Sequence, residues 1–168
     1  MTGWRSARLE DMAVLTDWID SPKTLAQWGG LSVTWPVRAD DLWQQIEVAF
    51  LPSFSLDAHG ELQAFGQLAP RENITTWHLC RLIVAPHLRG QKLGEKLCDH
   101  LVAQAISLGA TRITLNVATD NQAALRLYQR LGFASAGPVN ERGIQPMARQ
   151  LQAFFEHKKS YPMNTKKA

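Results

Sequence analysis

The most informative segment of the sequence is Leu82-Ile83-Val84-Ala85-Pro86-His87-Leu88-Arg89-Gly90-Gln91-Lys92-Leu93-Gly94. An apolar run ends at a proline, a short basic turn with a glycine follows, and an amphipathic pattern then begins. This order predicts a buried strand, a loop and the first turn of a helix. The first N–H groups of a helix have no internal acceptor and lie at the positive end of its dipole. The pattern therefore indicates a site for a phosphate group.

Length and composition predict a single globular domain. The chain has 168 residues, of which 45% are hydrophobic and 20% are charged, and this balance is typical of a folded chain with its own core. No run of 18 apolar residues is present, and the first residues lack the apolar stretch of a signal peptide, so we expect a cytoplasmic location. Cys80 and Cys98 do not have the spacing of metal ligands, which predicts neither a metal site nor a disulfide framework.

The basic balance of the chain comes from its last residues. The sequence pI is about 9.1, but Lys158, Lys159, Lys166 and Lys167 lie together in a stretch without acids. Without these four, 14 Lys and Arg residues face 15 Asp and Glu residues, a net charge of −1. A nucleic-acid-binding domain would carry its basic face on the fold itself, so this function is disfavoured. We expect a domain over residues 1–151 and a basic, disordered, solubilising tail over residues 152–168.

Hydrophobic periodicity predicts an α/β domain with a mixed sheet and the order βααβββαβαββ. The stretch from Trp28 to Pro36 is too rich in glycine and proline for regular structure. The expected strands span 4–8, 54–57, 62–68, 75–84, 112–117, 133–139 and 144–151, and the expected helices span 11–20, 40–50, 93–108 and 121–131. The two strands at 54–57 and 62–68 are predicted to form a hairpin.

Two motifs in this order resemble the GNAT superfamily of acyl-CoA-dependent N-acetyltransferases. The family's phosphate-loop signature, Arg/Gln-x-x-Gly-x-Gly/Ala after Val-x-Pro, corresponds to Arg89 to Gly94, which match it at every fixed position except Lys92. Its second pattern, Asn-x-x-Ala-x-x-x-Tyr-x-x-x-Gly-Phe, is met at Asn121, Ala124, Tyr128, Gly132 and Phe133. The Gly-Lys-Ser/Thr of a Walker loop and the Gly-x-Gly-x-x-Gly of a dinucleotide site are both missing.

The resemblance implies a GNAT-like fold and acetyl-CoA as the acyl donor, with no metal. It implies that the acetyl group is transferred directly, in a ternary complex, to an amine of a small molecule or a protein N-terminus. We expect a monomer or a homodimer, without nucleic-acid or membrane partners. The backbone of Leu82 and Val84 would pair with the pantetheine arm like an added strand, and the amide of Ile83 would stabilise the oxyanion. The cofactor-binding set implied in this way is Leu82, Ile83, Val84, Arg89, Gly90, Gln91, Lys92, Leu93, Gly94, Asn121 and Tyr128.

Lys92 departs from the signature, because it stands where the family has its first glycine. If this position needs a positive φ, a lysine there costs on the order of 1 kcal/mol. Its ammonium could contact a phosphate of the ligand as a point charge. A solvated lysine on a turn is an equally open interpretation.

Amine acetylation needs a neutral nucleophile, a proton donor for the leaving thiolate and a route for the proton that the amine loses. Tyr128 is predicted to be the acid, with a structural core tyrosine as the alternative. Some relatives carry a glutamate near the position of Asn116, which cannot act as a base. His78 is the leading candidate for the base, since an imidazole with a pKa near ~6.5 is largely neutral at pH 7. A cross-strand histidine, Glu72 and water remain alternatives.

Strand alternation predicts that His78 and Cys80 share one face with Leu82, whereas Leu79, Arg81 and Ile83 share the other. Cys80 is therefore assigned to packing.

The acceptor site is predicted from the divergent first half of the chain. Trp28, Trp35 and Gln67 are the candidate substrate-binding residues, although tryptophans more commonly cap a core. The second hypothesis is a regulatory module that binds coenzyme A without effective transfer. Release of free thiol from acetyl-CoA across a panel of amines separates the two hypotheses.

Overall fold

A computed structural model describes residues 3–151, and the predicted basic tail lies outside this range. The chain forms a single mixed α/β domain, as predicted, around one seven-stranded sheet with the strand order β1-β2-β3-β4-β5-β7-β6. All neighbouring strands are antiparallel except β4 and β5, which are parallel. The strands are β1 (Gly3–Ser6), β2 (Ser53–Ala58), β3 (Glu61–Pro70), β4 (Thr76–Val84), β5 (Arg112–Ala118), β6 (Ala134–Ser135) and β7 (Ile144–Gln150).

Five α-helices and one 3-10 turn complete the described part of the chain: α1 (Asp11–Trp18), α2 (Pro22–Trp28), α3 (Ala39–Gln45), η1 (Pro86–Leu88), α4 (Leu93–Ser107) and α5 (Gln122–Arg130). The predicted order lacks α2. The helix predicted over 11–20 is followed at once by this second helix, whose N-terminus is capped by the Ser21 hydroxyl, which accepts from the Thr24 N–H. Proline is well suited to the first position of a helix, so these two residues start a helix here.

The central hairpin is confirmed, and some predicted boundaries are corrected. His59 and Gly60 both have positive φ, 55° and 78°, which fits the two-residue turn that joins β2 to β3. The predicted helix over 40–50 is shorter, because α3 ends at Gln45. The predicted strand over 133–139 is reduced to the two residues of β6.

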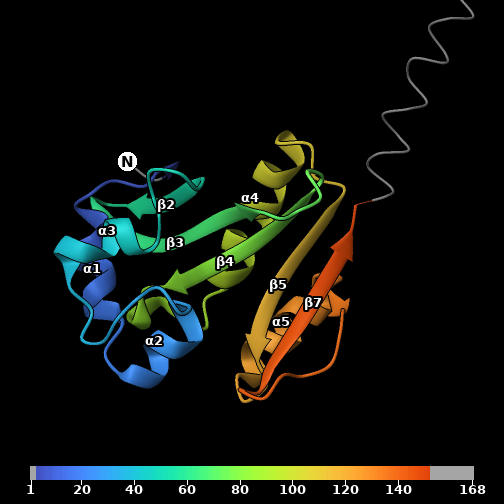
Figure 1. Ribbon diagram of the computed structural model, residues 1–168. Coiled ribbons are helices and arrows are strands. Elements are labelled where there is room, and N and C mark those ends of the chain that lie inside the picture. The colour runs from blue at the N-terminus through green and yellow to red at the C-terminus, as the bar shows by residue number, and fades with distance from the viewer. Residues whose placement is uncertain (1–2, 152–168) are drawn as a thin grey trace, which may run out of the picture.

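Two hydrophobic clusters cover the two faces of the sheet. One gathers the buried side of α4 with β5 and β7, and α5 packs against it. The other joins α1, α2 and α3 to β3 and β4. Figure 1 shows the consequence, with α4 and α5 on one side of the sheet and α2 on the other. A molecule that contacts α2 and a molecule that contacts α4 therefore approach the sheet from opposite faces.

A buried polar cluster ties the first strand to the first helix. The Asp11 carboxylate accepts from both terminal nitrogens of Arg5, at 2.8 and 2.9 Å, and from the Ser55 hydroxyl at 2.8 Å. Arg5 also donates to Asp57 on β2. Burial alone would raise the pKa of Asp11, but hydrogen bonds from Arg5, the Arg8 N–H and Ser55 together hold that pKa below its usual value.

Within residues 3–151, no helix has both the length and the apolar character needed to cross a membrane. In the same range, no three His, Cys, Asp or Glu side chains form a group that could hold a metal ion.

Candidate active site

The two central strands of the sheet are paired only near their beginnings. Residues 76–78 of β4 lie opposite residues 112–114 of β5 in parallel register. Beyond them β4 continues along β3, and β5 continues along β7. The facing edges of the two strands therefore leave backbone groups without a sheet partner. The sheet opens between the carboxyl-terminal halves of β4 and β5, as Figure 1 shows.

A β-bulge changes the direction of the side chains within β4. The register against β3 shifts at this point, and Arg81 has a φ of 53°. Strict alternation predicted one shared face for Leu79, Arg81 and Ile83, and that prediction is wrong. Leu79 packs in the cluster with α4, whereas Ile83 packs in the cluster with α1 to α3. The extra residue of the bulge exchanges the two faces for the rest of the strand.

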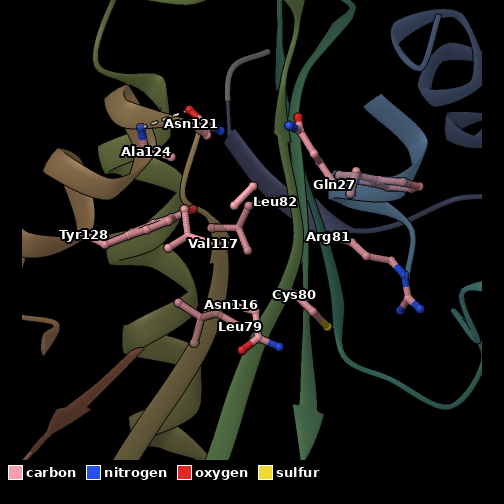
Figure 2. Close-up of a pocket in the computed structure, with 12 residues that line it drawn as sticks. Gln27, Leu79, Cys80, Arg81, Leu82, Asn116, Val117, Asn121, Ala124 and Tyr128 are labelled. Carbon is pink, nitrogen blue, oxygen red and sulfur yellow. Dashed lines mark hydrogen bonds between the residues drawn. The ribbon is translucent and has the colours of Figure 1, made fainter. Parts of the chain in front are cut away.

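A small cavity of about 100 Å³ lies at the opening between the strands. Its walls come from both faces of the sheet, because Gln27 on α2 and Tyr128 on α5 both line it together with β4 and β5. Figure 2 shows Tyr128 and Ala124 on one side of β4 and the side chains of Gln27 and Arg81 on the other. Leu82, predicted on the face of Cys80, packs instead against the cluster with α4. The cavity thus connects the two faces.

Tyr128 directs its phenol group toward this cavity (Figure 2). Its ring packs edge-on against Phe133 at a centroid distance of 6.0 Å. Within residues 3–151 its hydroxyl has no hydrogen-bond partner. Burial, with a smaller contribution from Cys98, raises the pKa of Tyr128 well above its ordinary value. The phenol therefore stays protonated at neutral pH and is a weaker acid than the phenol of an exposed tyrosine.

The predicted phosphate loop begins α4. Lys92 is the N-cap residue and has a φ of 67°, so the lysine does occupy the left-handed region that favours glycine. Gly90 has a φ of 80°. The Lys96 N–H donates to the Lys92 carbonyl oxygen at 3.2 Å, and the amides of the first turn before it lie outside the helical ladder. These donors remain available to an anion.

A larger groove, of about 850 Å³, lies on the α2 side of the opening. It shares Gln27, Trp28 and the middle of β4 with the small cavity. The charged residues and the histidine along it come from six segments of the chain: Lys23, Glu47, Arg71, His78 with Arg81, Asp120 and Arg142.

His78 lies in the wall of this groove at the point where β4 and β5 separate. The residue is 8% exposed, and its Nδ1 lies 2.7 Å from the Thr114 hydroxyl oxygen on β5. Burial, followed by the positive charges of Arg71 and Arg81, lowers the pKa of His78 to about 3. The ordinary histidine pKa expected from the sequence is therefore wrong. The imidazole stays neutral throughout the neutral range and is a weak base.

The two cysteines remain unpaired. Burial raises the pKa of Cys80, and burial with the nearby Asp99 raises the pKa of Cys98 to about 12. Both side chains are thiols at neutral pH and therefore poor nucleophiles.

The three candidate substrate residues have different surroundings. Trp28 lines both cavities. Trp35 is 46% exposed and is not part of either lining. Gln67 is fully buried, and its amide donates to the Ile46 carbonyl oxygen and to Ser53 and accepts from Arg81. The structure thus brings only Trp28 to the opening, while Gln67 supports the wall through Arg81.

Of the other residues considered in the sequence analysis, two line a cavity and one does not. Asn121 caps α5, accepting from the Ala124 N–H at 3.2 Å, and lines the small cavity. Asn116 lines both cavities. Glu72 is exposed in the loop before β4 and lies outside both linings.

Several groove residues were not predicted from the sequence. Lys23 and Gln27 on α2 both contact Asp120 after β5, at 3.5 and 3.3 Å. Arg71 and Arg142 belong to loops at opposite ends of the groove. No motif marks these residues, because only the tertiary fold brings their segments together.

Comparison with known proteins identifies a family that covers most of the chain. Residues 13–133 match the family model described as Acetyltransferase (GNAT) family. The [ribosomal protein bS18]-alanine N-acetyltransferase of Escherichia coli K12 is 32% identical over 84 residues, which are 50% of this chain and 55% of that protein. The spermine/spermidine N(1)-acetyltransferase of Bacillus subtilis 168 is 32% identical over 81 residues, or 48% of this chain and 53% of that protein.

The chain spans about half the length of the curated relatives it matches. Among solved structures, the aminoglycoside acetyltransferase AAC(6')-Ib in complex with coenzyme A superposes with a TM-score of 0.72 at 20% identity. The superposition covers 94% of this chain and 99% of that one.

Proposed function

The chain belongs to the GNAT family of acetyltransferases, and on that premise we propose that it transfers an acetyl group from acetyl-CoA to a primary amine. The observation that carries the proposal is the opening between β4 and β5, which connects the α4–α5 face to the groove on the α2 face. Donor and acceptor can then meet from opposite faces in one ternary complex. The acceptor amine is proposed to belong to a small molecule or a protein N-terminus, and the reaction to take place in the cytoplasm.

The donor site is proposed on the α4 side. The amides from Arg89 to Gly94 would hold the pyrophosphate, and their position at the start of α4 supports this role. The unpaired edge of β4 from Leu82 to Val84 would bond to the pantetheine arm. Asn121 and Tyr128 line the small cavity from the same side. When bound, acetyl-CoA supplies a thioester carbonyl activated for attack.

The transfer step is balanced by groups of this chain. The amine nitrogen attacks the thioester carbonyl carbon, a C–N bond forms, and the C–S bond breaks as the thiolate leaves. Tyr128 is proposed to give its proton to the thiolate and to regain a proton from solvent, and its place in the lining of the small cavity supports this role. The amide of Ile83 at the edge of the opening is proposed to stabilise the oxyanion.

The burial of His78 argues against its predicted role as the base. A histidine with a pKa of about 3 does not compete for the proton of an amine. We therefore propose that water carries this proton out through the open groove and that neutral His78 orients it. Glu72, being exposed outside the groove, has less support.

The test is release of free thiol from acetyl-CoA across a panel of primary amines, with binding of coenzyme A measured by calorimetry. Transfer to at least one amine, lowered in Tyr128→Phe while the affinity for coenzyme A is kept, supports an enzyme. Binding without thiol release for any amine supports the alternative regulatory module, which the low pKa of His78 and the absence of a carboxylate at Asn116 favour. Failure to bind coenzyme A contradicts both.

A further inference from the structure

The groove on the α2 face contains more positive than negative charge. Its six charged residues are the cations Lys23, Arg71, Arg81 and Arg142 and the carboxylates Glu47 and Asp120. His78 adds no charge, because it is neutral.

The carboxylates do not neutralise the arginines. Asp120 is paired with Lys23 at 3.5 Å, so these two charges offset each other. Within residues 3–151, neither Arg71 nor Arg142 has a carboxylate oxygen within 4.0 Å, and the same holds for Arg81. Among the described residues, Glu47 is then the one carboxylate of the groove that is not in an ion pair, against three arginines that are not in one either.

Arg81 is held by neutral groups alone. Its Nε donates to the Gly29 carbonyl oxygen and one terminal nitrogen donates to Gln67 Oε1, both at 3.0 Å. The other terminal nitrogen reaches the Ser32 hydroxyl at 3.4 Å. These contacts fix the guanidinium in the wall and leave its positive charge uncompensated.

Trp28 adds an unused hydrogen-bond donor to the same wall. The residue is 8% exposed, and its indole N–H is buried without an acceptor among the described residues. A buried donor without an acceptor is costly, and it adds no negative charge to offset the arginines of this wall.

We infer that the acceptor is an amine that also carries a carboxylate group. This inference rests on the proposed function and names the class of its acceptor. Arginine side chains form strong charge-assisted hydrogen bonds with carboxylates, often through two parallel N–H groups. Arg81 and Trp28 stand beside the opening, while Arg71 and Arg142 can turn toward the ligand from the two ends of the groove.

The two exposed arginines lie at opposite ends for a topological reason. The Arg71 N–H bonds to the carbonyl oxygen of Thr76 at the start of β4, and Arg142 precedes Gly143, whose carbonyl oxygen accepts from the Thr119 N–H beyond the end of β5. Since β4 and β5 are parallel, these positions are far apart along the groove. A carboxylate displaced from the reacting amine toward either end of the groove would therefore come nearer to one of them.

The same charges disfavour a polyamine. Its second ammonium group would lie near three arginines and a single unpaired carboxylate, and like charges repel strongly in a partly desolvated groove. The polyamine acetyltransferase of Bacillus subtilis thus shares the fold motifs with this chain, whereas the acceptor groove points to the opposite sign of substrate charge.

The experiment compares matched acceptors. Alanine, phenylalanine and glutamate are each offered as the free amino acid and as the α-carboxamide, with spermidine as a polycation, and kcat/KM is measured by thiol release. We expect the free acids to exceed their carboxamides by about tenfold or more, the usual effect of one charged hydrogen bond. The carboxamide has the more easily deprotonated amine, so intrinsic reactivity favours the other order.

The variant Arg71→Gln/Arg142→Gln should lose most of this preference. Arg8→Gln/Arg38→Gln removes two exposed arginines outside the groove and should keep it, which excludes an effect of net charge alone. Equal rates for acids and carboxamides in the unmodified protein, or faster transfer to spermidine, would overturn the inference while leaving the proposed function intact.

A binding measurement covers the case in which no member of the panel is acetylated. Conjugates in which the sulfur of coenzyme A is joined through a methylene-carbonyl link to the α-amine of phenylalanine or phenylalaninamide bridge both sides of the opening. The carboxylate conjugate should bind about tenfold more tightly. Equal affinities overturn the inference, and an absence of binding by coenzyme A itself removes the proposed function along with it.

Discussion

His78 makes the stability of this fold depend on pH in a way that can be worked out from one side chain. The pKa of His78 is about 3 in the folded protein, whereas a histidine in the unfolded chain has the ordinary value of 6.5. As the pH falls below 6.5, the unfolded chain binds a proton that folded His78 does not take up. Stability from this group is therefore complete above pH 6.5 and is lost toward pH 3.

The size of the effect follows from the difference in pKa. Between pH 7 and pH 5, the preferential protonation of the unfolded chain removes about 2 kcal/mol of unfolding free energy, and the full loss near pH 3 is about 5 kcal/mol. The substitution His78→Gln removes the titrating group and keeps a polar side chain opposite Thr114.

The measurement is urea denaturation of both proteins at pH 7, 6 and 5. The unmodified protein should lose about 2 kcal/mol more than His78→Gln between the first and the last pH. Any constant cost of the substitution cancels in this comparison, as does the titration of the carboxylates. His87→Gln, which removes an exposed histidine, should follow the unmodified protein.

Parallel loss of stability in the unmodified protein and His78→Gln would refute the assignment of a neutral, desolvated His78. If His78→Gln does not fold, NMR titration of the imidazole in the unmodified protein replaces it. We expect no protonation of His78 down to pH 5, and a midpoint near 6.5 would contradict the argument.

Three further changes test other parts of the structure. Lys92→Gly should raise the unfolding free energy by about 0.5 to 1 kcal/mol by relieving the left-handed backbone, whereas Lys92→Ala should not, as urea denaturation will show. Tyr128→Phe should lower kcat at least about tenfold with little change in the calorimetric affinity for coenzyme A; an unchanged kcat removes the phenol as the acid. Asp11→Asn should cost about 2 kcal/mol by weakening the charged hydrogen bonds from Arg5, which keeps Asp57 as its partner. It should also flatten the acid side of the stability curve, because stability from a lowered carboxyl pKa is lost as the pH falls.

The parts of the fold with local signals were predicted well. The helix α4 ends before Gly109 and α5 before Gly132, and both glycines have positive φ, 92° and 93°. Asn121 caps α5 with its own side chain. Each of these features depends on a few neighbouring residues, so the sequence pattern is sufficient to predict them.

The details of the groove could not be predicted in this way. The bulge at Arg81 depends on pairing with β3, so alternation within β4 gave the wrong faces for Leu79 and Ile83. The low pKa of His78 arises from burial and from Arg71 and Arg81, which only the folded chain brings near it. Gln67 has the polarity of a binding residue, but the fold uses it to hold Arg81.

The short pairing of β4 with β5 divides the sheet into two parts, β1 to β4 on one side and β5, β7 and β6 on the other, which are joined by few hydrogen bonds. Only residues 76–78 and 112–114 join them through the ladder, whereas all seven residues of β5 are paired with β7. A molecule that fills the opening would therefore bridge two bodies, and its binding energy would resist their separation. Slower amide hydrogen exchange would then extend to β7, a strand that the bound molecule need not touch.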